Sequence, residues 1–110
     1  MNERLIGWST SIEEMLALYL PLLRQREDRH ATEASLRVAL RAEPIARGCP
    51  RLAMLTPVDL VGAREYLTMQ GDKNIEGALT ALEGFLAWAR GIGAHSMSAE
   101  IVEAALRPRA

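Results

Sequence analysis

The sequence predicts an all-α fold, a compact orthogonal bundle of four to five helices joined by short loops. Apolar residues recur at intervals of three and four along several stretches, which is the spacing of amphipathic helices. Alternating apolar and polar stretches rich in β-branched residues, which would predict strands, are nearly absent. The 110 residues, 49% of them apolar and 25% charged, suffice for one modest core, so we expect a single domain over residues 1–110.

The first helix is expected over residues 11–26. Thr10 and Ser11 each precede a glutamate by three residues, and both pairs fit a capping box. Pro21 lies inside the helical pattern and removes one backbone donor, so we expect a kink there or an early end. The expected buried face consists of Ile12, Met15, Leu16, Tyr19, Leu20 and Leu23.

The second helix is expected within residues 32–47, beginning at Thr32 and ending or bending at Pro44. Arg37 and Arg41 lie one turn apart on a face that differs from the core stripe. The core stripe is narrow and consists of Leu36, Ala39 and Leu40.

The third helix begins at residues 56–59, where the sequence Thr-Pro-Val-Asp gives the clearest start signal in the chain. It supplies a capping hydroxyl, a proline at the first helical position and an acid in the first turn. Gly71 is expected to close the helix. The inward residues are Leu60, Ala63 and Leu67, flanked by Val61 and Tyr66.

The fourth helix has the most regular pattern of the five. Asp72 or Asn74 can cap its start, and Gly91 and Gly93 are expected to stop it. Trp88 adds a large side chain near its end, which we expect in the core together with the apolar stripe. That stripe consists of Ile75, Ala78, Leu79, Leu82, Phe85, Leu86 and Ala89.

A short fifth helix is expected over residues 98–106, because Pro108 prevents any continuation. Its apolar residues are Ile101, Val102, Ala105 and Leu106. Residues 96–110 thus form a short C-terminal helix and tail.

The cysteine and histidine content argues against a metal centre and against nucleophilic catalysis. Cys49 is the single cysteine, so the chain can form neither an intrachain disulfide nor a thiolate zinc site of its own. His30 and His95 lie far apart without ligand spacing, and we interpret both as ordinary loop residues. Because no nucleophile, phosphate-loop or zinc-protease motif is present either, we expect no enzyme activity and no cofactor.

The longest apolar run, residues 15–23, is less than half of the roughly 20 residues that a membrane span needs. No secretory signal is recognisable, and one cysteine suits a reducing compartment. We therefore expect a cytoplasmic protein that has no contact with a membrane.

The net charge of −1 conceals an uneven distribution. Residues 21–51 carry seven arginines against four acids, whereas the segments on either side are net acidic. This excess of arginine is typical of an anion-binding surface, since guanidinium groups bind phosphate bidentately. It is equally compatible with a solvated face, on which Glu33 and Arg37 form a helical ion pair worth roughly 0.2–0.5 kcal/mol.

Two segments resemble the core-binding domain of tyrosine recombinases (phage integrases). Residues 51–67, RLAMLTPVDLVGAREYL, resemble the family pattern "l..lt..dl..yl". Residues 72–93, DKNIEGALTALEGFLAWARGIG, resemble the helix that follows it, "s..t....l..l..ff.wa...g". The aromatic, "wa" and glycine positions of that helix correspond to Phe85, Trp88, Ala89 and Gly93.

The resemblance covers residues 10–95 and implies a SAM-like helical domain that grips one face of duplex DNA. The catalytic half of such enzymes, with its arginine, lysine, His-x-x-Arg pair and nucleophilic tyrosine, is not recognisable in this sequence. We interpret Tyr19 and Tyr66 as packing residues, so the chain itself should not cut DNA. The expectation is a detached domain, a truncated gene product or a piece of a longer recombinase.

Candidate DNA contacts are exposed basic side chains and helix starts, where backbone N–H groups favour phosphate. For two of the candidates a structural role is the simpler alternative to a DNA contact. Arg90 would complement the negative end of the helix dipole, and Asn74 would cap the helix. Glu76 and Glu83 make the fourth helix more acidic than the family usually has it. The candidates are Thr32, Arg37, Arg41, Lys73, Asn74 and Arg90.

The alternative function is a helical protein–protein interaction or self-association module that binds no DNA. The small net charge, the acidic fourth helix and several surplus apolar residues favour it. Residues 98–106 could pack on a second subunit and form a homo-oligomer. The surplus apolar residues are Met54, Val61, Met69 and Met97.

Overall fold

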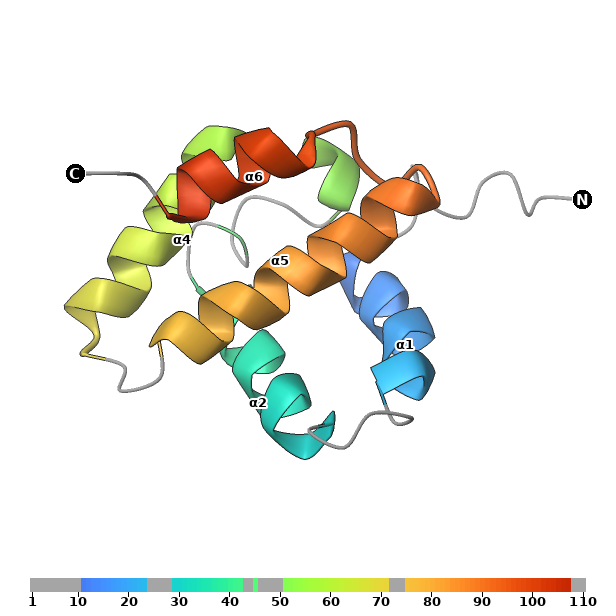
Figure 1. Cartoon of the computed structure of the whole chain (residues 1–110), viewed down its shortest axis with the longest axis horizontal. Helices are drawn as coiled ribbons and strands as arrows, with labels where there is room; N and C mark the ends of the chain where they lie inside the picture. The colour runs from blue at the N-terminus through green and yellow to red at the C-terminus, as the bar shows by residue number, and fades with distance from the viewer. Residues whose placement is uncertain (1–10, 24–28, 43–44, 46–50, 72–74, 108–110) are drawn as a thin grey trace, which may run out of the picture.

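Helices account for nearly all of the regular structure in the computed structural model, which describes residues 11–23, 29–42, 45, 51–71 and 75–107 (Figure 1). No strand occurs in these ranges, only one isolated bridge between Ser11 and Arg51. The all-α prediction is confirmed. The elements are α1 Ile12–Leu23, α2 Arg29–Leu40, the 3-10 turn η2 Leu52–Met54, α4 Pro57–Met69, α5 Ile75–Gly91 and α6 Ala99–Leu106.

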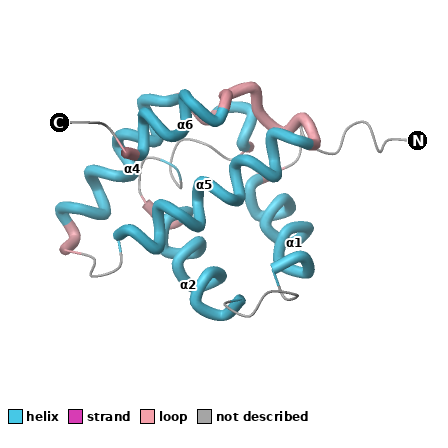
Figure 2. The backbone as a smooth tube through the Cα atoms, in the orientation of Figure 1, coloured by secondary structure: helices cyan, strands magenta, loops and turns pink. Residues whose placement is uncertain are grey.

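Helix α5 lies at the centre of the bundle. In Figure 1 it crosses the middle of the molecule, with α1 and α2 on one side and α4 and α6 on the other. Figure 2 shows the same arrangement, with α2 running beneath α5. The buried face of α5 agrees with the sequence prediction at all but two positions. Ala81 is buried although the sequence did not predict it, and Ile75 is only half-buried. The buried residues of α5 are Ala78, Leu79, Ala81, Leu82, Phe85, Leu86 and Ala89.

The start of α1 is a capping box, as the sequence predicted for Ser11. The Ser11 N–H donates to Glu14 Oε1 at 3.0 Å, and the Glu14 N–H donates to Ser11 Oγ at 3.1 Å. The other predicted cap, Thr10, lies outside the described residues. Pro21 does not end the helix, which continues through it to Leu23. Because Pro21 and Ala17 are both exposed, water can solvate the Ala17 carbonyl that the proline leaves without a donor.

An aromatic cluster fastens α1 to α5. The ring centroid of Tyr19 lies 5.2 Å from that of Phe85 and 5.1 Å from that of Trp88. Phe85 is fully buried, Tyr19 is nearly so, and Trp88 is half-buried at the edge. These tilted contacts are the favoured geometry of aromatic pairs. The interpretation of Tyr19 as a packing residue is confirmed, and Tyr66 also packs against the core.

Helix α2 begins three residues earlier than predicted. It starts at Arg29, so Thr32 lies inside the helix, half-buried, rather than at its first position. The capping signal at Thr32 was misleading because the preceding arginine and alanine are good helix formers, which extend the helix past it. Leu36 and Ala39 are fully buried as expected, whereas Leu40 is only half-buried. The predicted stop at Pro44 lies outside the described residues.

Helix α4 starts and ends as the sequence predicted. The Asp59 N–H donates to Thr56 Oγ1 at 3.3 Å, and the Thr56 N–H donates to Asp59 Oδ2 at 2.9 Å, with a proline at the first turn. Gly71 has a φ of +71°, a conformation that a residue with a Cβ rarely adopts. The inward residues Leu60, Ala63 and Leu67 are buried.

The end of α5 is a Schellman turn built on Gly93. The Ala94 N–H donates to the Ala89 carbonyl at 2.9 Å, and the Gly93 N–H donates to the Arg90 carbonyl at 3.0 Å. Gly93 has a φ of +82°, which reverses the chain and brings α6 back over α4 and α5. Ser98 then caps α6 by accepting from the Ile101 N–H at 3.2 Å.

The apolar face of α6 is narrower than predicted. Val102, Ala105 and Leu106 are buried against α4 and α5, but Ile101 is 44% exposed. Met97, which the sequence set aside as surplus, is buried in the core of its own chain. Three of the four apolar residues predicted for this helix are therefore buried within the molecule.

His95 is a buried structural residue and not an ordinary loop residue. Its side chain is 4% exposed, Nε2 lies 2.7 Å from the Leu86 carbonyl oxygen, and Nδ1 accepts from the Met97 N–H at 3.1 Å. Only the neutral ring with its proton on Nε2 satisfies both contacts. Burial lowers the pKa of this imidazole below its ordinary value of 6.5, and the Arg90 charge lowers it further, against the raising effect of the Leu86 hydrogen bond.

Removing the threonine that caps α4 should destabilise the fold more than removing a threonine inside the same helix. We expect Thr56→Ala to lower the free energy of unfolding by about 1 kcal/mol, measured by urea denaturation. Thr68→Ala is the control on the same helix, because the Thr68 hydroxyl donates to the Arg64 carbonyl one turn earlier and caps no helix start. Equal losses in the two variants would contradict the role of the cap.

The stability of the fold should fall in mild acid through His95. In the folded state the His95 pKa is lowered, so below its ordinary value of 6.5 the unfolded chain binds more protons. Urea unfolding at about pH 7.5 and about pH 5 should show a loss that is smaller in His95→Gln. Identical losses in wild type and His95→Gln would refute this assignment.

Candidate functional site

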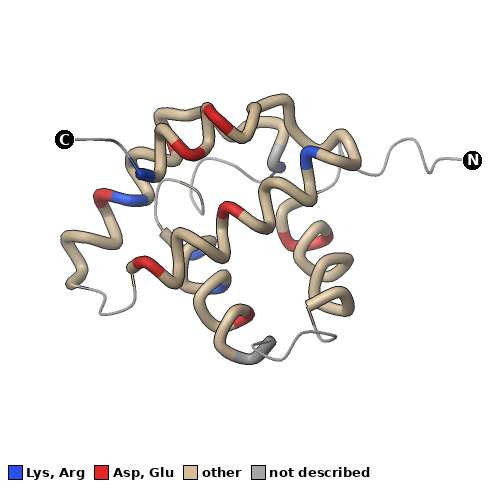
Figure 3. Tube along the Cα trace, viewed as in Figure 1, with Lys and Arg blue, Asp and Glu red and all other residues tan. Residues whose placement is uncertain are grey.

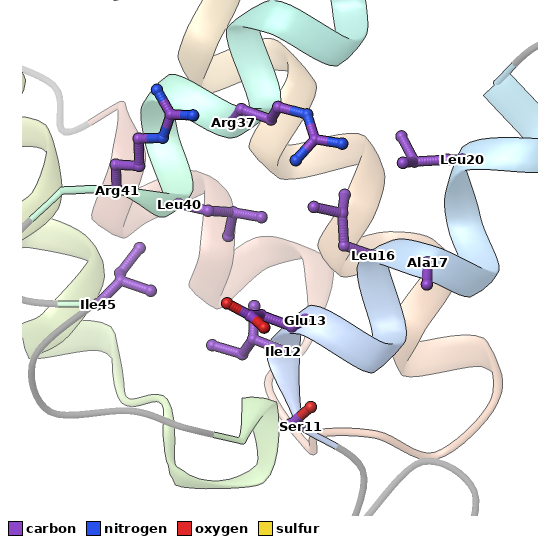
Figure 4. Close-up of a pocket in the computed structure, with 10 residues that line it drawn as sticks. All are labelled: Ser11, Ile12, Glu13, Leu16, Ala17, Leu20, Arg37, Leu40, Arg41 and Ile45. Carbon is purple, nitrogen blue, oxygen red and sulfur yellow. The ribbon is translucent and has the colours of Figure 1, made fainter.

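A groove of about 710 Å³ lies between α1 and α2. Its floor is apolar, and its charged side chains are Glu13 from α1 and Arg37 and Arg41 from the C-terminal end of α2 (Figure 4). Figure 4 shows the guanidinium of Arg37 reaching toward α1 and that of Arg41 projecting away from it. The apolar floor consists of Ile12, Leu16, Leu20, Leu40 and Ile45.

Arg37 is already paired within its own helix. Its Nε and Nη2 donate to the same Glu33 oxygen, Oε2, at 3.2 and 3.1 Å. The Arg37 side chain remains 41% exposed and keeps donors that this carboxylate does not use. The helical ion pair that the sequence suggested is present, and it leaves Arg37 able to contact a second anion.

Arg41 is the less committed of the two arginines. It is exposed directly after α2, and its backbone N–H continues the last turn by donating to the Arg37 carbonyl at 3.1 Å. Its guanidinium forms no hydrogen bond or ion pair with any residue in the described part of the chain. A cation at this place complements the negative end of the helix dipole.

The structure brings together only two of the predicted DNA-binding residues that it describes, Arg37 and Arg41. Thr32 is half-buried within α2, so it offers no helix N-terminus to a phosphate. Arg90 is exposed in the last turn of α5 and lines a different groove. Lys73 and Asn74 lie outside the described residues.

The second groove, of about 600 Å³, lies between α5 and α6. Arg90, Glu83 and Glu103 line it, so its charges are mixed. His95 also lines it, but both ring nitrogens already have backbone partners. This groove therefore offers no free histidine for catalysis or for metal binding.

Arg107 pairs with two acidic residues of α5, Glu76 and Glu83. Its Nη1 donates to Glu76 Oε1 at 2.5 Å, its Nε to Glu83 Oε1 at 3.1 Å, and its Nη2 to Thr80 Oγ1 at 2.7 Å. The hydrogen bond to Glu76 is the largest cause that raises the pKa of this guanidinium. Sequence reasoning missed this cluster, although the spacing of the three α5 residues places them on one helical face.

Charge is spread unevenly over the described helices (Figure 3). The helical residues of α1 and α6 that carry charge are all acidic, namely Glu13 and Glu14 in α1 and Glu100 and Glu103 in α6. Among the described residues, Arg37 and Arg41 lie together at the end of α2, across the groove from the acidic start of α1.

Among the described residues, no group of three or more histidine, cysteine, aspartate or glutamate side chains could hold a metal ion. Within the same residues, no helix is both long and apolar enough to cross a membrane.

Comparison with known proteins finds no similar family model, no similar curated protein and no similar solved structure. Similarity to tyrosine recombinases therefore rests on the two sequence segments alone.

The ion pair between Arg107 and Glu83 should give a measurable coupling free energy between the end of α6 and the middle of α5. A double-mutant cycle of Arg107→Gln and Glu83→Gln should give a coupling energy of about 0.5–1 kcal/mol, since both side chains are partly buried. The control cycle pairs Arg107→Gln with Glu100→Gln, an exposed acid on α6. A coupling no larger than that of the control would show that the pair adds nothing to stability.

Proposed function

We propose that this chain is a DNA-binding module, similar to the SAM-like core-binding domain of tyrosine recombinases. The observation that carries the proposal is the pair of arginines, Arg37 and Arg41, at one end of α2 beside the α1–α2 groove. Duplex DNA would contact this end of α2 through its phosphates, without base readout assigned to any residue.

The order of elements supports the proposal. The segment over residues 51–67 coincides with η2 and most of α4, and the segment over residues 72–93 contains all of α5. Phe85 packs at the centre of the fold and Gly93 turns the chain, as packing and turn positions of such a domain should.

The two arginines have different expected weights. Arg41 is free of side-chain partners in the described chain, so its guanidinium can bind a phosphate bidentately. Arg37 must share its charge with Glu33, which weakens any phosphate contact that it makes. We therefore assign the main phosphate contact to Arg41 and a secondary contact to Arg37.

Acidic residues near the site would repel phosphate and so limit the affinity for DNA. Arg107 offsets part of the charge of Glu76 and Glu83 on α5, whereas Glu13 on the opposite rim of the groove forms no ion pair with a described residue. Because the described residues of the site include few basic side chains, binding should be weak and sensitive to salt, with a dissociation constant of roughly 10⁻⁴–10⁻⁶ M.

We assign no catalytic role to this chain. The sequence contains no recognisable counterpart of the recombinase catalytic half, so strand cleavage would belong to a separate domain. The second candidate function, self-association through residues 98–106, has little geometric support, because α6 buries its apolar face in its own chain.

Fluorescence anisotropy tests the proposal with the full chain and a labelled random duplex of roughly 30 base pairs. Binding should be clear at roughly 50 mM salt and collapse at roughly 200 mM. Arg41→Ala should lower the salt slope by about one, and Arg37→Ala by less. Glu33→Gln should strengthen binding, because it frees the Arg37 guanidinium.

Arg90→Ala is the matched control, since it removes the same charge from a different groove. A loss as large as that of Arg41→Ala would mean that affinity follows net charge and not the end of α2. No binding by the wild-type chain at low salt would reject the DNA-binding function itself.

A further inference from the structure

The floor of the α1–α2 groove is apolar, and phosphate contacts at the end of α2 make no use of it. Leu16 of α1 and Leu40 of α2 are both only half-buried, although the sequence predicts both for the core. In Figure 4 the Leu40 side chain points across the groove toward Leu16. Covering apolar surface of this kind is favourable, so the floor suits an apolar group of a ligand.

Three floor residues follow one another along α1. Ile12, Leu16 and Leu20 are spaced four positions apart, so they form a row about 12 Å long on one side of the helix. The groove volume of about 710 Å³ lies within the range of small-molecule sites, roughly 300–1,000 Å³. An extended aliphatic chain matches a floor of this length and composition.

The basic side chains beside the floor select an anionic group for one end of such a chain. Figure 4 shows Arg37 reaching toward α1, whereas Arg41 projects away from it. Glu33 accepts from Nε and Nη2 of Arg37, so the Nη1 donors take no part in that ion pair. These donors can hold a carboxylate beside the apolar floor.

Glu13 limits the ligand to a single acidic group. It lines the groove from α1, next to Ile12 at the start of the apolar row, and it forms no ion pair with a described residue. A second carboxylate at that end of the ligand would be repelled by Glu13. The groove is therefore complementary to a molecule that is anionic at one end and apolar over the rest.

We propose that the α1–α2 groove binds a free, unbranched aliphatic monocarboxylate of medium chain length. Its carboxylate accepts hydrogen bonds from Arg37, and its hydrocarbon chain covers Leu16 and Leu40. This site does not depend on DNA binding, because it uses the apolar floor and Arg37, whereas the main phosphate contact is assigned to Arg41.

Isothermal titration calorimetry of the full chain with decanoate tests the proposal, without DNA and below the concentration at which decanoate forms micelles. Each methylene group that the floor covers should strengthen binding about threefold to fourfold, so decanoate should bind roughly a hundredfold more tightly than hexanoate. Decyltrimethylammonium, which has the same chain and the opposite charge, should bind much more weakly. Decanedioate should also bind more weakly, because its second carboxylate meets Glu13.

A variant of the floor tests the contact with the hydrocarbon chain. Leu16→Gln keeps a residue of good helix propensity and should weaken decanoate binding about tenfold. Leu18→Gln is the matched control on the same helix, since Leu18 is 46% exposed and does not line the groove. It should bind decanoate like the wild type, and circular dichroism should show that both variants are folded.

Variants of the charged residues test the contact with the carboxylate and leave the floor intact. Arg37→Gln should weaken decanoate binding about tenfold without weakening that of decyltrimethylammonium, because the Arg37 side chain is 41% exposed and its loss leaves the core unchanged. Arg41→Gln should have a clearly smaller effect on decanoate. Glu13→Gln should bring the affinity for decanedioate close to that for decanoate.

Four results would overturn the proposal. These are no binding of decanoate, equal binding of decanoate and decyltrimethylammonium, equal losses in Leu16→Gln and Leu18→Gln, and equal losses in Arg37→Gln and Arg41→Gln. Flotation with phosphatidylglycerol vesicles separates a free ligand from a membrane lipid, and binding to the vesicles without binding to decanoate would also overturn it. Because no DNA is present, failure of these measurements is distinguishable from failure of the anisotropy experiment.

Discussion

The burial of α5 is the constraint on which the rest of the structure depends. Phe85, Leu82 and Leu86 are fully buried because other helices cover α5 on both sides. Each neighbouring element is attached to it by a different means: α2 crosses it, the Tyr19 ring joins α1 to it, and the turn at Gly93 returns α6 over it. Buried leucine and phenylalanine side chains contribute roughly 1.5–3 kcal/mol each, so this single helix gathers a large share of the apolar driving force.

Internal charge compensation decides how much of the surface remains able to bind an anion. Arg107 is engaged by Glu76 and Glu83, and Arg37 is engaged by Glu33, so both of these arginines form ion pairs within the chain. Arg41 forms no such pair with any described residue, which leaves its guanidinium available at the end of α2. Within the described residues, the phosphate site that we propose is therefore at the end of α2, beside the α1–α2 groove.

Helix α1 closes the groove on the side opposite the α2 arginines. It contributes Glu13 and Leu16 to the groove lining, and Tyr19 holds the helix against α5 from another side. The shape of the groove therefore depends on how the aromatic cluster positions α1.

The helical class, the capped starts at Ser11 and Thr56 and the turn at Gly93 could be predicted from the sequence, because those signals join residues only a few positions apart. Features that join distant residues became visible only once the helices were packed together. His95 is structural because α5 and α6 enclose it, and Arg107 reaches acids 24 and 31 positions away. The same reason explains the candidate site: spacing alone placed Arg37 and Arg41 on one side of a helix, but only packing showed that Arg90 lines another groove and that Thr32 lies within α2. Local chemistry specifies where helices begin and end, whereas burial and pairing depend on which helices meet.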